Sequence, residues 1–587
     1  MKAKIRNLLS RIIPVISLYP MVLTTALIAG VCAFILAYYD SSDHFPIVRL
    51  LFSSLLGIPL FFAAKMRAQK SGNELLLTLV SLVLVGLFYF SLPSSEEDFS
   101  DRYIYWIFPV FFLSHLVVAL LPYLSKKRNE SKFWEYNKNL FIQIVQTAVF
   151  SLVLVGGVVL AILSIDKLFL IDLKTNLYPA TFFFLIIFFN TFIFLLFSGE
   201  GISYLEKERE YPEILKFFTQ FVLIPLLLIY SIILYLYAIK ILFSWQLPEG
   251  WVSYLILSYA VVGTVAQMLV DPLKGQDKKS WVRYFSSIFY YSLIPLLVLL
   301  FVAIFTRILE YGFTEPRYYV LALAIWLVVI TGGKMLKKNQ GIRFIPFSLL
   351  IIGLIALFMP FINAFSVAKQ SQKQELSILL KENKLLKDGK IDFSANLEQS
   401  KVDEIADKFM FLYERKERDY LFTFLTPKEE KKISEIEKKN PGSLRYFDIR
   451  NLFSNVKMAS VRGNNIELRR QNLAIHTGGY RYIFSLESGA PVTLVLPGDS
   501  LKVEQTFNQS LKSFTITNSK GDTHDFMPLI KKKLSTTPKA EIPTIADLLE
   551  EEFTLGGKRM KIIYTSISKG PSEKDMYYVQ PFILLVE

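Results

Sequence analysis

Eleven long runs of apolar residues occupy the first 365 residues of the chain. A helix needs about 20 mostly apolar residues to cross the roughly 30 Å hydrocarbon core of a bilayer, and charged or turn-forming residues bound each run. The pattern predicts eleven transmembrane helices, the tenth being the shortest. The predicted spans are Pro20–Tyr39, Ile47–Ala64, Leu75–Leu92, Tyr103–Leu124, Leu140–Ile165, Leu177–Phe197, Phe217–Phe243, Trp251–Val270, Phe285–Thr306, Tyr318–Ile330 and Phe344–Phe365.

The pattern changes after the eleventh run. Residues 366–440 are charged and carry apolar side chains at spacings of three and four, which predicts amphipathic helices that do not span the membrane. The turn signals Asp388-Gly389 and Pro441-Gly442 separate the pieces. The apolar stripes are Leu376, Leu379, Leu380 and Leu385, and then Val402, Ile405, Phe409 and Leu412.

From about Asn472 the apolar period becomes two, and Gly, Pro, Asn and Asp separate short runs. Such alternation is typical of half-buried strands and predicts a β-rich module. One helical interruption is expected at Ile545–Glu552. The predicted strands are Tyr480–Glu487, Val492–Leu496, Lys502–Phe507, Ser513–Asn518, Met560–Ser566 and Met576–Val586.

The composition agrees with a membrane protein. Hydrophobic residues make up 52% of the chain and aromatic residues 15%, and the mean hydropathy is +0.39, far above the average of soluble proteins. The net charge of +14 has a topological explanation, so a nucleic-acid partner is not expected. Cys32 is the only cysteine, which excludes an intrachain disulfide and a multi-cysteine metal site. No cofactor is expected.

The loops between the predicted spans differ in positive charge. The N-terminal segment and every second loop hold 23 Lys and Arg residues in total, whereas the other five loops hold 5. Lys and Arg near span ends resist translocation, so the N-terminus is expected in the cytoplasm. With eleven spans, everything after Phe365 is expected outside. The expected location is the bacterial inner (cytoplasmic) membrane, with the C-terminal module in the periplasm.

These patterns together predict an α-helical integral membrane bundle followed by an α+β, β-rich extracytoplasmic C-terminal module. The expected domains are a polytopic transmembrane domain at 1–365, an amphipathic helical connector at 366–440 and a soluble module at 441–587.

Ionisable residues inside a membrane usually mark ion or proton paths. No carboxylate lies midway through any predicted span, which disfavours coupled transport. His115, Gln143 and Gln146 are expected to hydrogen-bond to neighbouring helices. The phosphate-binding, serine-hydrolase and zinc-protease motifs are absent, so no catalytic residue and no metal ligand is predicted.

Two outside loops are acidic. One contains Asp40 and Asp43, the other Glu96, Glu97 and Asp98. Acid-rich loops translocate easily, and this is the simpler interpretation. The alternative is a divalent-metal or base site, because polyprenyl-phosphate sugar transferases with many spans use external carboxylates of this kind.

The turn between the ninth and tenth spans keeps two arginines, against the trend of the outside loops. Two interpretations remain open for it. Glu310 and Glu315 pair with the arginines in a self-neutralised cap, or the arginines bind an anionic group such as a lipid phosphate, with the bidentate geometry that guanidinium provides. The residues of this candidate site are Arg307, Glu310, Tyr311, Gly312, Thr314, Glu315 and Arg317.

Two stretches resemble a family of bacterial multi-pass inner-membrane proteins that is known only as a domain of unknown function. They are the segment 307–318, which reads RILEYGFTEPRY, and the segment 211–220, YPEILKFFTQ, with Pro225 and the run 230–238, YSIILYLYA, behind it. The resemblance implies a bacterial inner-membrane protein and supplies no activity, cofactor or site residue.

The leading hypothesis for the function is a non-enzymatic envelope protein that senses, scaffolds or assists export. Its expected partners are the lipid bilayer and, through the C-terminal module, envelope proteins or anionic lipid. The alternative is a lipid-linked glycosyl or phosphoglycan transferase that uses the acidic loops, and a facilitator-type transporter is third.

Overall fold

The structure is a computed structural model of the 587-residue chain. It describes residues 12–39, 45–96, 98–124, 129–171, 173–208, 210–244, 251–271, 281–336, 341–439, 444, 446–453, 456–457, 466–470, 477–486, 491–507, 511–536, 544–546, 549–569, 577–579 and 582–587.

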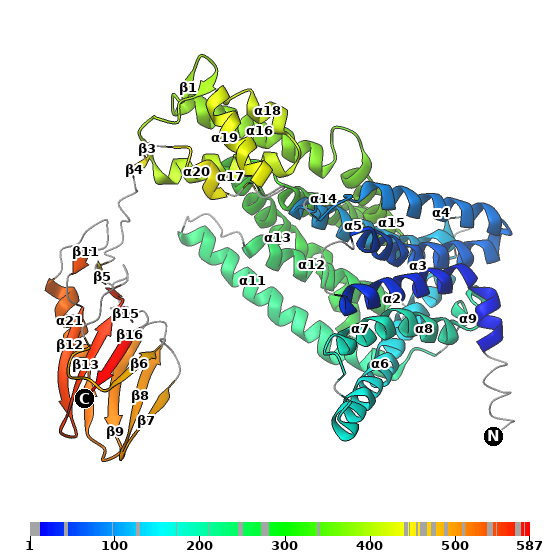
Figure 1. Ribbon diagram of the computed structural model, residues 1–587. Helices are drawn as coiled ribbons and strands as arrows, with labels where there is room; N and C mark the ends of the chain where they lie inside the picture. Colours follow the sequence, from blue (N-terminus) through cyan, green and yellow to red (C-terminus); the bar gives the residue numbers. More distant parts are fainter. Residues whose placement is uncertain are drawn as a thin grey trace. The chain divides into compact units, whose positions relative to one another are not determined.

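Ten helices or unbroken helical runs among the described residues are long and apolar enough to cross a membrane, which confirms the predicted fold class (Figure 1). Two of the runs contain a π-helical segment, η4 or η5. The ten are α2 (Pro20–Tyr38), α3 (Phe45–Ser71), α4 (Glu74–Ser91), α5 (Ile104–Leu120) with η2 (Asp101–Tyr103) and η3 (Leu121–Tyr123), α6 (Glu130–Phe169), α7 (Leu177–Phe184) with η4 (Leu185–Phe189) and α8 (Asn190–Ser198), α10 (Glu213–Phe217) with η5 (Phe218–Leu223) and α11 (Ile224–Ser244), α12 (Trp251–Val270), α13 (Trp281–Tyr311) and α14 (Glu315–Leu336).

The last two predicted spans differ from expectation in length. The tenth, expected to be the shortest, is the 22-residue α14, whereas the eleventh is α15 (Phe344–Phe358), with 15 residues. The helix stops there because Pro360 has no N–H to donate, and Phe361 adopts a left-handed φ of 66°. A new helix, α16 (Ala364–Glu382), then begins. Its N-cap residue is Asn363, whose side chain accepts a hydrogen bond from the Ser366 N–H.

Among the described residues, the membrane helices pack around two larger hydrophobic clusters and a smaller one, which joins α3, α4 and α5. One of the larger clusters joins α2, α3, α5, α6 and α8, and the other joins α11, α12, α13 and α14. The short α15 contributes to both, through Ile345 to the second and through Leu350 and Leu357 to the first. Across α6 and α8, the Ser198 hydroxyl donates to Gln143 at 3.0 Å, so Gln143 makes the expected interhelical hydrogen bond, whereas Gln146 is exposed.

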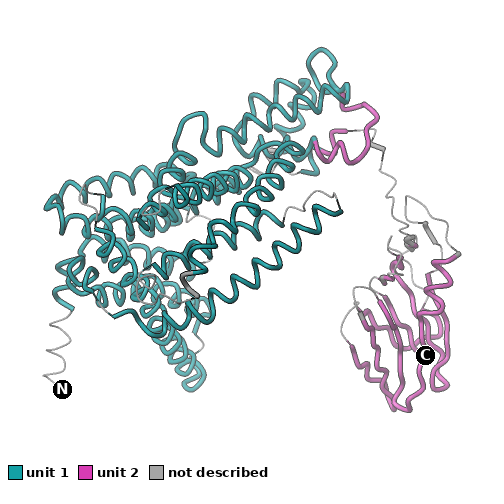
Figure 2. Tube along the Cα trace, turned by 180° about the vertical axis from the view of Figure 1, so that it is seen from behind, with its two compact units in different colours: residues 1–391, 405–449 teal, residues 392–404, 450–587 magenta. Residues whose placement is uncertain are grey.

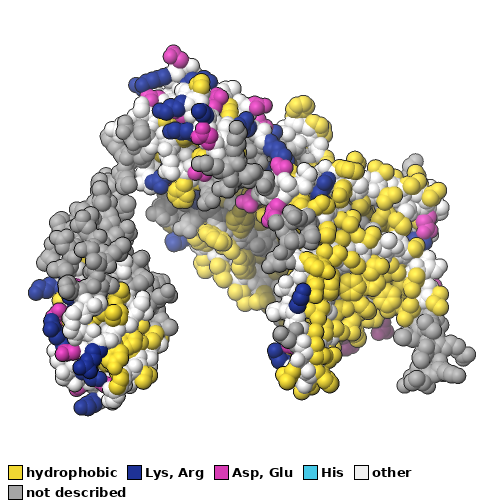
Figure 3. All heavy atoms as spheres, viewed as in Figure 1, with side chains coloured by type: hydrophobic (Ala, Val, Ile, Leu, Met, Phe, Trp, Pro, Cys, Tyr) yellow, Lys and Arg dark blue, Asp and Glu magenta, His cyan; other side chains and the backbone are white. Residues whose placement is uncertain are grey.

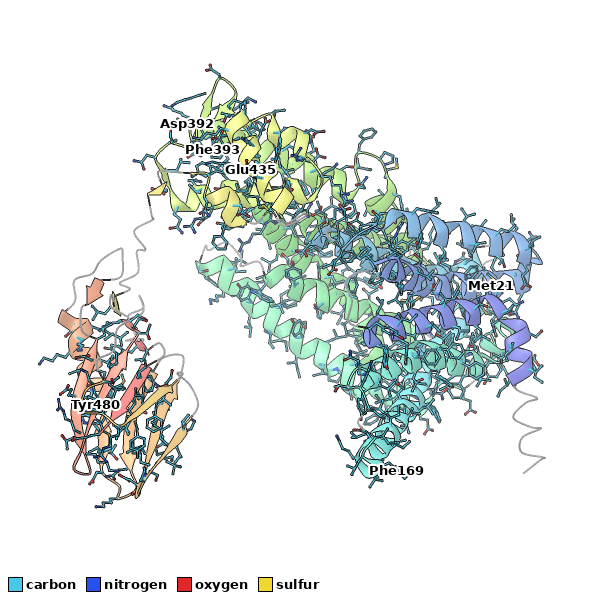
Figure 4. All side chains as sticks on the ribbon, in the orientation of Figure 1. Met21, Phe169, Asp392, Phe393, Glu435 and Tyr480 are labelled. Carbon is cyan, nitrogen blue, oxygen red and sulfur yellow. The ribbon has the colours of Figure 1, made fainter. Side chains whose placement is uncertain are left out.

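Hydrophobic side chains cover the outer faces of these helices (Figure 3). Phe169 lies at the far end of α6, where 71% of its surface is exposed (Figure 4). A soluble protein rarely exposes so large an apolar field, whereas lipid tails solvate it without cost.

The helices that follow α15 belong to the same compact unit as the membrane helices, residues 1–391 and 405–449 (Figure 2). The predicted stripe of α16 is buried, because Leu376 and Leu380 are 0% exposed and Leu379 is 6% exposed. Asp388 and Gly389 form the expected turn, both with positive φ; Pro441-Gly442 lies outside the described residues. The elements are α16, the hairpin β1 (Leu386–Lys387) and β2 (Lys390–Ile391), α17 (Gln399–Glu414), α18 (Arg418–Phe422), α19 (Pro427–Lys439) and α20 (Tyr446–Arg450).

The second unit, residues 392–404 and 450–587, is β-rich. Three four-stranded sheets have the orders β10-β9-β8-β7, β12-β13-β16-β6 and β11-β5-β14-β15, and β3 pairs with β4. Phe514 of β9 meets Phe582 of β16 at 4.9 Å between ring centroids, in the core that the sheets share. The strands are β3 (Leu397–Glu398), β4 (Val456–Lys457), β5 (Ile466–Arg470), β6 (Tyr482–Leu486), β7 (Val492–Leu496), β8 (Asp499–Phe507), β9 (Leu511–Asn518), β10 (Thr523–Asp525), β11 (Thr544–Ala546), β12 (Glu550–Leu555), β13 (Lys558–Tyr564), β14 (Ser566–Lys569), β15 (Tyr577–Val579) and β16 (Phe582–Val586).

The prediction of a helix at Ile545–Glu552 was wrong. This segment contributes to strands β11 and β12, and β12 forms a hairpin with β13 through Gly556 and Gly557, both with positive φ. The helix of the unit is α21 (Met527–Thr536). Its buried residues Met527, Ile530 and Leu534 have helical spacing, but a run of three lysines between them hides the stripe in the sequence.

Candidate functional site

The loops after the third and ninth membrane helices meet the segment after α15 at one end of the bundle. Asp98, in the loop between α4 and α5, pairs with Lys416 at 3.0 Å. The Tyr318 hydroxyl, at the start of α14, donates to the carbonyl of Ile362. This end, which we call the connector end, therefore carries α16 and α17.

The described parts of the loops after the second, fourth, sixth and tenth membrane helices meet at the opposite end. Arg343, before α15, donates to the carbonyl of Tyr123 at 2.6 Å. Glu206, after α8, accepts a hydrogen bond from the Tyr123 hydroxyl and pairs with Lys70 in the last turn of α3. Burial of Glu206 acts to raise its pKa, but these contacts outweigh burial and lower the pKa.

The two groups of contacts show that α15 runs from one end of the bundle to the other. Its 15 residues rise about 22 Å, less than a typical hydrocarbon core. Because α15 packs between the two larger hydrophobic clusters, protein surrounds much of it. The loops after the third and ninth membrane helices and the segment after α15 thus share one end.

The turn between α13 and α14 is the contact surface for α16. The Gln372 amide donates to the carbonyls of Tyr311 and Phe313, each at 2.9 Å, and the Phe313 N–H donates to the Ser371 hydroxyl at 2.8 Å. Gly312 has φ +75°, and a Cβ there would lie 2.8–2.9 Å from atoms of α16. Only glycine fits both the backbone and the space.

The two arginines of the turn contact the turn itself, and the anion-binding interpretation stays a prediction. Arg317 donates to the carbonyl of Gly312 at 2.8 Å and closes the turn on itself. The guanidinium groups of Arg307 and Arg317 lie 5.7 Å and 5.3 Å from the centroid of the Tyr311 ring. Glu310 lies in the last turn of α13, directly before Tyr311. Thr314 contributes its carbonyl to the first turn of α14.

Glu315 pairs with Arg415 of the connector. The Nε and Nη2 atoms of Arg415 each donate to a carboxylate oxygen of Glu315 at 2.7 Å. The side chains are 0% exposed for Glu315 and 5% for Arg415. Arg415 also lies 3.3 Å from the ring centroid of Phe411 and donates to its carbonyl at 2.9 Å. A bidentate, charge-assisted pair of this kind fixes both position and orientation.

Sequence reasoning missed Arg415 and Gln372, although the signal was present. Gln372 lies four residues before Leu376 on the buried stripe of α16, and Arg415 lies three residues after Leu412 on that of α17. A polar residue on an apolar stripe is buried and needs a partner.

The acidic loops are only partly described. Asp40, Asp43 and Glu97 lie outside the described residues, Glu96 is exposed, and Asp98 pairs with Lys416. The hydrogen bond from Lys416 lowers the pKa of Asp98. No group of three His, Cys, Asp or Glu residues within the described ranges could hold a metal ion.

A polar cavity of about 520 Å³ lies at the connector end, between the α4–α5 loop and α17. Asp98, Asp101, Glu414, Lys416 and Arg418 line it. Burial and the negative charges of Asp101 and Glu315 raise the pKa of Glu414, although Arg415 opposes them. Two acids with pKa values shifted in opposite directions thus face one cavity.

The helices, the buried ion pair and the sheets define a multi-pass α-helical membrane protein with a docked helical connector and a β-rich C-terminal unit. The chain belongs to the family described as Domain of unknown function (DUF4153), whose profile matches residues 21–407. This confirms the expected kind of family. The match covers α2 to α16 and ends inside α17, so most of the β-rich unit lies outside it.

The chain is similar to the uncharacterized protein PM1469 of Pasteurella multocida (strain Pm70). The two are 29% identical over 389 residues, which make up 65% of this chain and 62% of that protein. The chain thus covers less than two thirds of this relative. No solved structure matches the chain.

Proposed function

We propose that the protein is a scaffold of the bacterial inner membrane. The bundle and its connector form a fixed base, and the β-rich unit tethered to it binds a partner protein. The observation that carries this proposal is the exposure of apolar side chains on two edge strands. Among the described residues of the β-rich unit, the large apolar side chains that are exposed are Ile483 (56%), Val492 (37%) and Val495 (81%).

The strands that carry these residues, β6 and β7, are the last strands of their described sheets. An edge strand presents unpaired N–H and C=O groups, and proteins usually protect it with charge or a bulge. Exposed valine and isoleucine at such an edge favour addition of an extended segment from a partner. A rigid base supports this role, because the bidentate Glu315–Arg415 pair holds the connector against the bundle.

The side of the membrane is part of the proposal. The charge difference of 23 to 5 between the loops favours the connector end as the periplasmic end. Alkaline phosphatase fused after Glu587 should then be active, and a fusion after Lys70 should be inactive. The reverse pattern would place the β-rich unit in the cytoplasm and remove an envelope partner.

The partner surface can be tested by photo-crosslinking in intact cells. A photoreactive residue at Val495 or Ile483 should give discrete adducts, whereas the same residue at Lys512, exposed on the central strand β9, should give none. Val492→Lys should abolish the adduct formed at Val495 on the same strand, β7, without lowering the protein level, because a charge on an edge strand blocks strand addition. Equal labelling at all three positions would refute a specific edge contact.

The 520 Å³ cavity favours one second candidate, a lipid-linked glycosyl or phosphoglycan transferase. The raised pKa of Glu414 suits a general acid, and the lowered pKa of Asp98 suits a carboxylate that stays ionised. Glu414→Gln and Asp98→Asn should then each abolish transfer of lipid-linked sugar by the purified protein. Unchanged transfer in both variants would exclude this mechanism.

A further inference from the structure

An apolar cavity of about 240 Å³ opens on the lipid-facing side of the bundle, between α3, α4, α5 and α15. Its walls are almost entirely leucine, valine and phenylalanine, and Leu87 and Phe358 at its mouth are 62% and 53% exposed. Ser114 also lines it, but its hydroxyl donates to the carbonyl of Phe111 within α5. The cavity therefore suits a hydrocarbon chain, and we call it the slot.

A second cavity, of about 250 Å³, adjoins the first at the connector end. Ser91 and Trp106 line both cavities, and the Trp106 indole N–H donates to the Ser91 hydroxyl at 3.2 Å. Among the described residues, three cations line the second cavity, Arg102, Lys369 and Arg415, and no carboxylate does. A tryptophan between a cationic pocket and an apolar slot lies where membrane proteins meet lipid headgroups.

Carboxylates of the described residues do not fully neutralise two of these cations. Arg102 donates to the Tyr103 hydroxyl at 3.2 Å and forms no salt bridge within the described part of the chain. Lys369 pairs with Glu417 at 2.7 Å, but Glu417 also takes Lys373 at 2.5 Å. One carboxylate thus serves two lysines. Arg415 is already paired with Glu315, so it contributes positive charge to the cavity but no free hydrogen-bond donor.

The length of the slot matches the hydrocarbon thickness of one leaflet of the bilayer. Along α5, the eleven residue steps from Trp106 to Val117, both of which line the slot, rise about 16 Å. This is close to half of the roughly 30 Å hydrocarbon core.

We propose that the two cavities form one binding site for an anionic phospholipid of the surrounding bilayer. The phosphate lies against Arg102 and Lys369, and one acyl chain lies in the slot between α4, α5 and α15. This inference does not depend on the scaffold proposal, because the lipid contacts Arg102, Lys369 and the slot, whereas the proposed partner contacts the edge strands β6 and β7. The site is separate from the anion site expected at Arg307 and Arg317, which stays a prediction.

The test uses the full-length protein in nanodiscs that contain phosphatidylcholine and a minor fraction of phosphatidylglycerol. Bromine on the acyl chains of one lipid at a time quenches nearby tryptophan fluorescence. The difference between the wild type and Trp106→Phe isolates the signal of Trp106 among the six tryptophans. Brominated phosphatidylglycerol should quench this signal at a lower mole fraction than brominated phosphatidylcholine does.

Charge variants test the headgroup contacts. Arg102→Gln and Lys369→Gln should each weaken the preference for phosphatidylglycerol about fivefold, the change expected for one basic residue next to an anionic headgroup. Arg102→Lys should retain the preference. Lys381→Gln is the matched control, because Lys381 lies exposed on the same helix as Lys369, away from the cavity.

Leu354→Phe tests the slot, because it narrows the cavity and leaves the cations in place. Quenching by the brominated chain should fall in this variant. Equal quenching by the two lipids in the wild type would overturn the proposal and leave an ordinary lipid-facing groove. A second result would also overturn it: inorganic phosphate abolishes the preference for phosphatidylglycerol, and Leu354→Phe leaves the quenching unchanged. The site would then bind a soluble anion.

Discussion

Removing Arg415 should release the connector from the bundle. In Arg415→Met, Glu315 keeps its carboxylate at a position with 0% exposure but loses both hydrogen bonds of 2.7 Å. Breaking a buried pair by deleting one partner costs about 3–5 kcal/mol, because the other charge stays buried without compensation. We expect the docked state of α16 and of residues 405–414 to lose this amount.

Amide hydrogen exchange of the full-length protein in nanodiscs measures the loss. A cost of 3–5 kcal/mol accelerates exchange through local opening by roughly two to three and a half orders of magnitude. The acceleration should be confined to the connector helices. The double variant Glu315→Met/Arg415→Met should recover most of the protection, since an apolar pair of similar volume carries no buried charge.

The matched control is Lys416→Gln. Lys416 is 59% exposed and its partner Asp98 is 42% exposed, and exposed ion pairs contribute about 0–1 kcal/mol. Exchange in this variant should differ from the wild type by less than about tenfold. Unchanged connector exchange in Arg415→Met would refute the reasoning, because the pair would then not hold the connector.

Three further outcomes follow from the same end of the bundle. Gly312→Ala should destabilise connector docking by about 1–3 kcal/mol in the same exchange assay, because of its positive φ and the crowded Cβ; Gly86→Ala, whose Cβ would meet no atom within 4 Å, should have no such effect. Burial raises the pKa of Glu417, but hydrogen bonds from two lysines outweigh it and leave the pKa lowered. Its stabilising contribution is therefore complete above the unfolded-state pKa and is lost as the pH falls below about 4.5 and through the folded-state pKa; the protection of the connector amides, taken as the exchange rate relative to the intrinsic rate at each pH, should fall on acidification, and Glu417→Gln should reduce this dependence. Arg317→Lys should loosen the turn, because a lysine does not hold the carbonyl of Gly312 in the same planar geometry, whereas Arg307→Lys should leave connector exchange unchanged.

The membrane class and the connector stripes could be predicted from the sequence because both depend on local periodicity. A run of about 20 apolar residues is stable as a helix in lipid wherever its neighbours lie, so ten of the eleven predicted spans correspond to helices long enough to cross. The stripe of Val402, Ile405, Phe409 and Leu412 is buried as expected. Helix ends were less predictable, because Pro360 and a single left-handed residue shortened the eleventh span.

Only the tertiary structure decided which charges meet. The sequence places Glu315 two residues from Arg317, and proximity along the chain favoured a local pair. In the fold, Glu315 meets Arg415, one hundred residues away, because α16 and α17 dock against the turn after α13. The same docking brings Lys369 next to Arg102 and makes the cationic cavity. Local patterns set each helix and its buried face, but partners that close long loops depend on packing among helices, which periodicity does not encode.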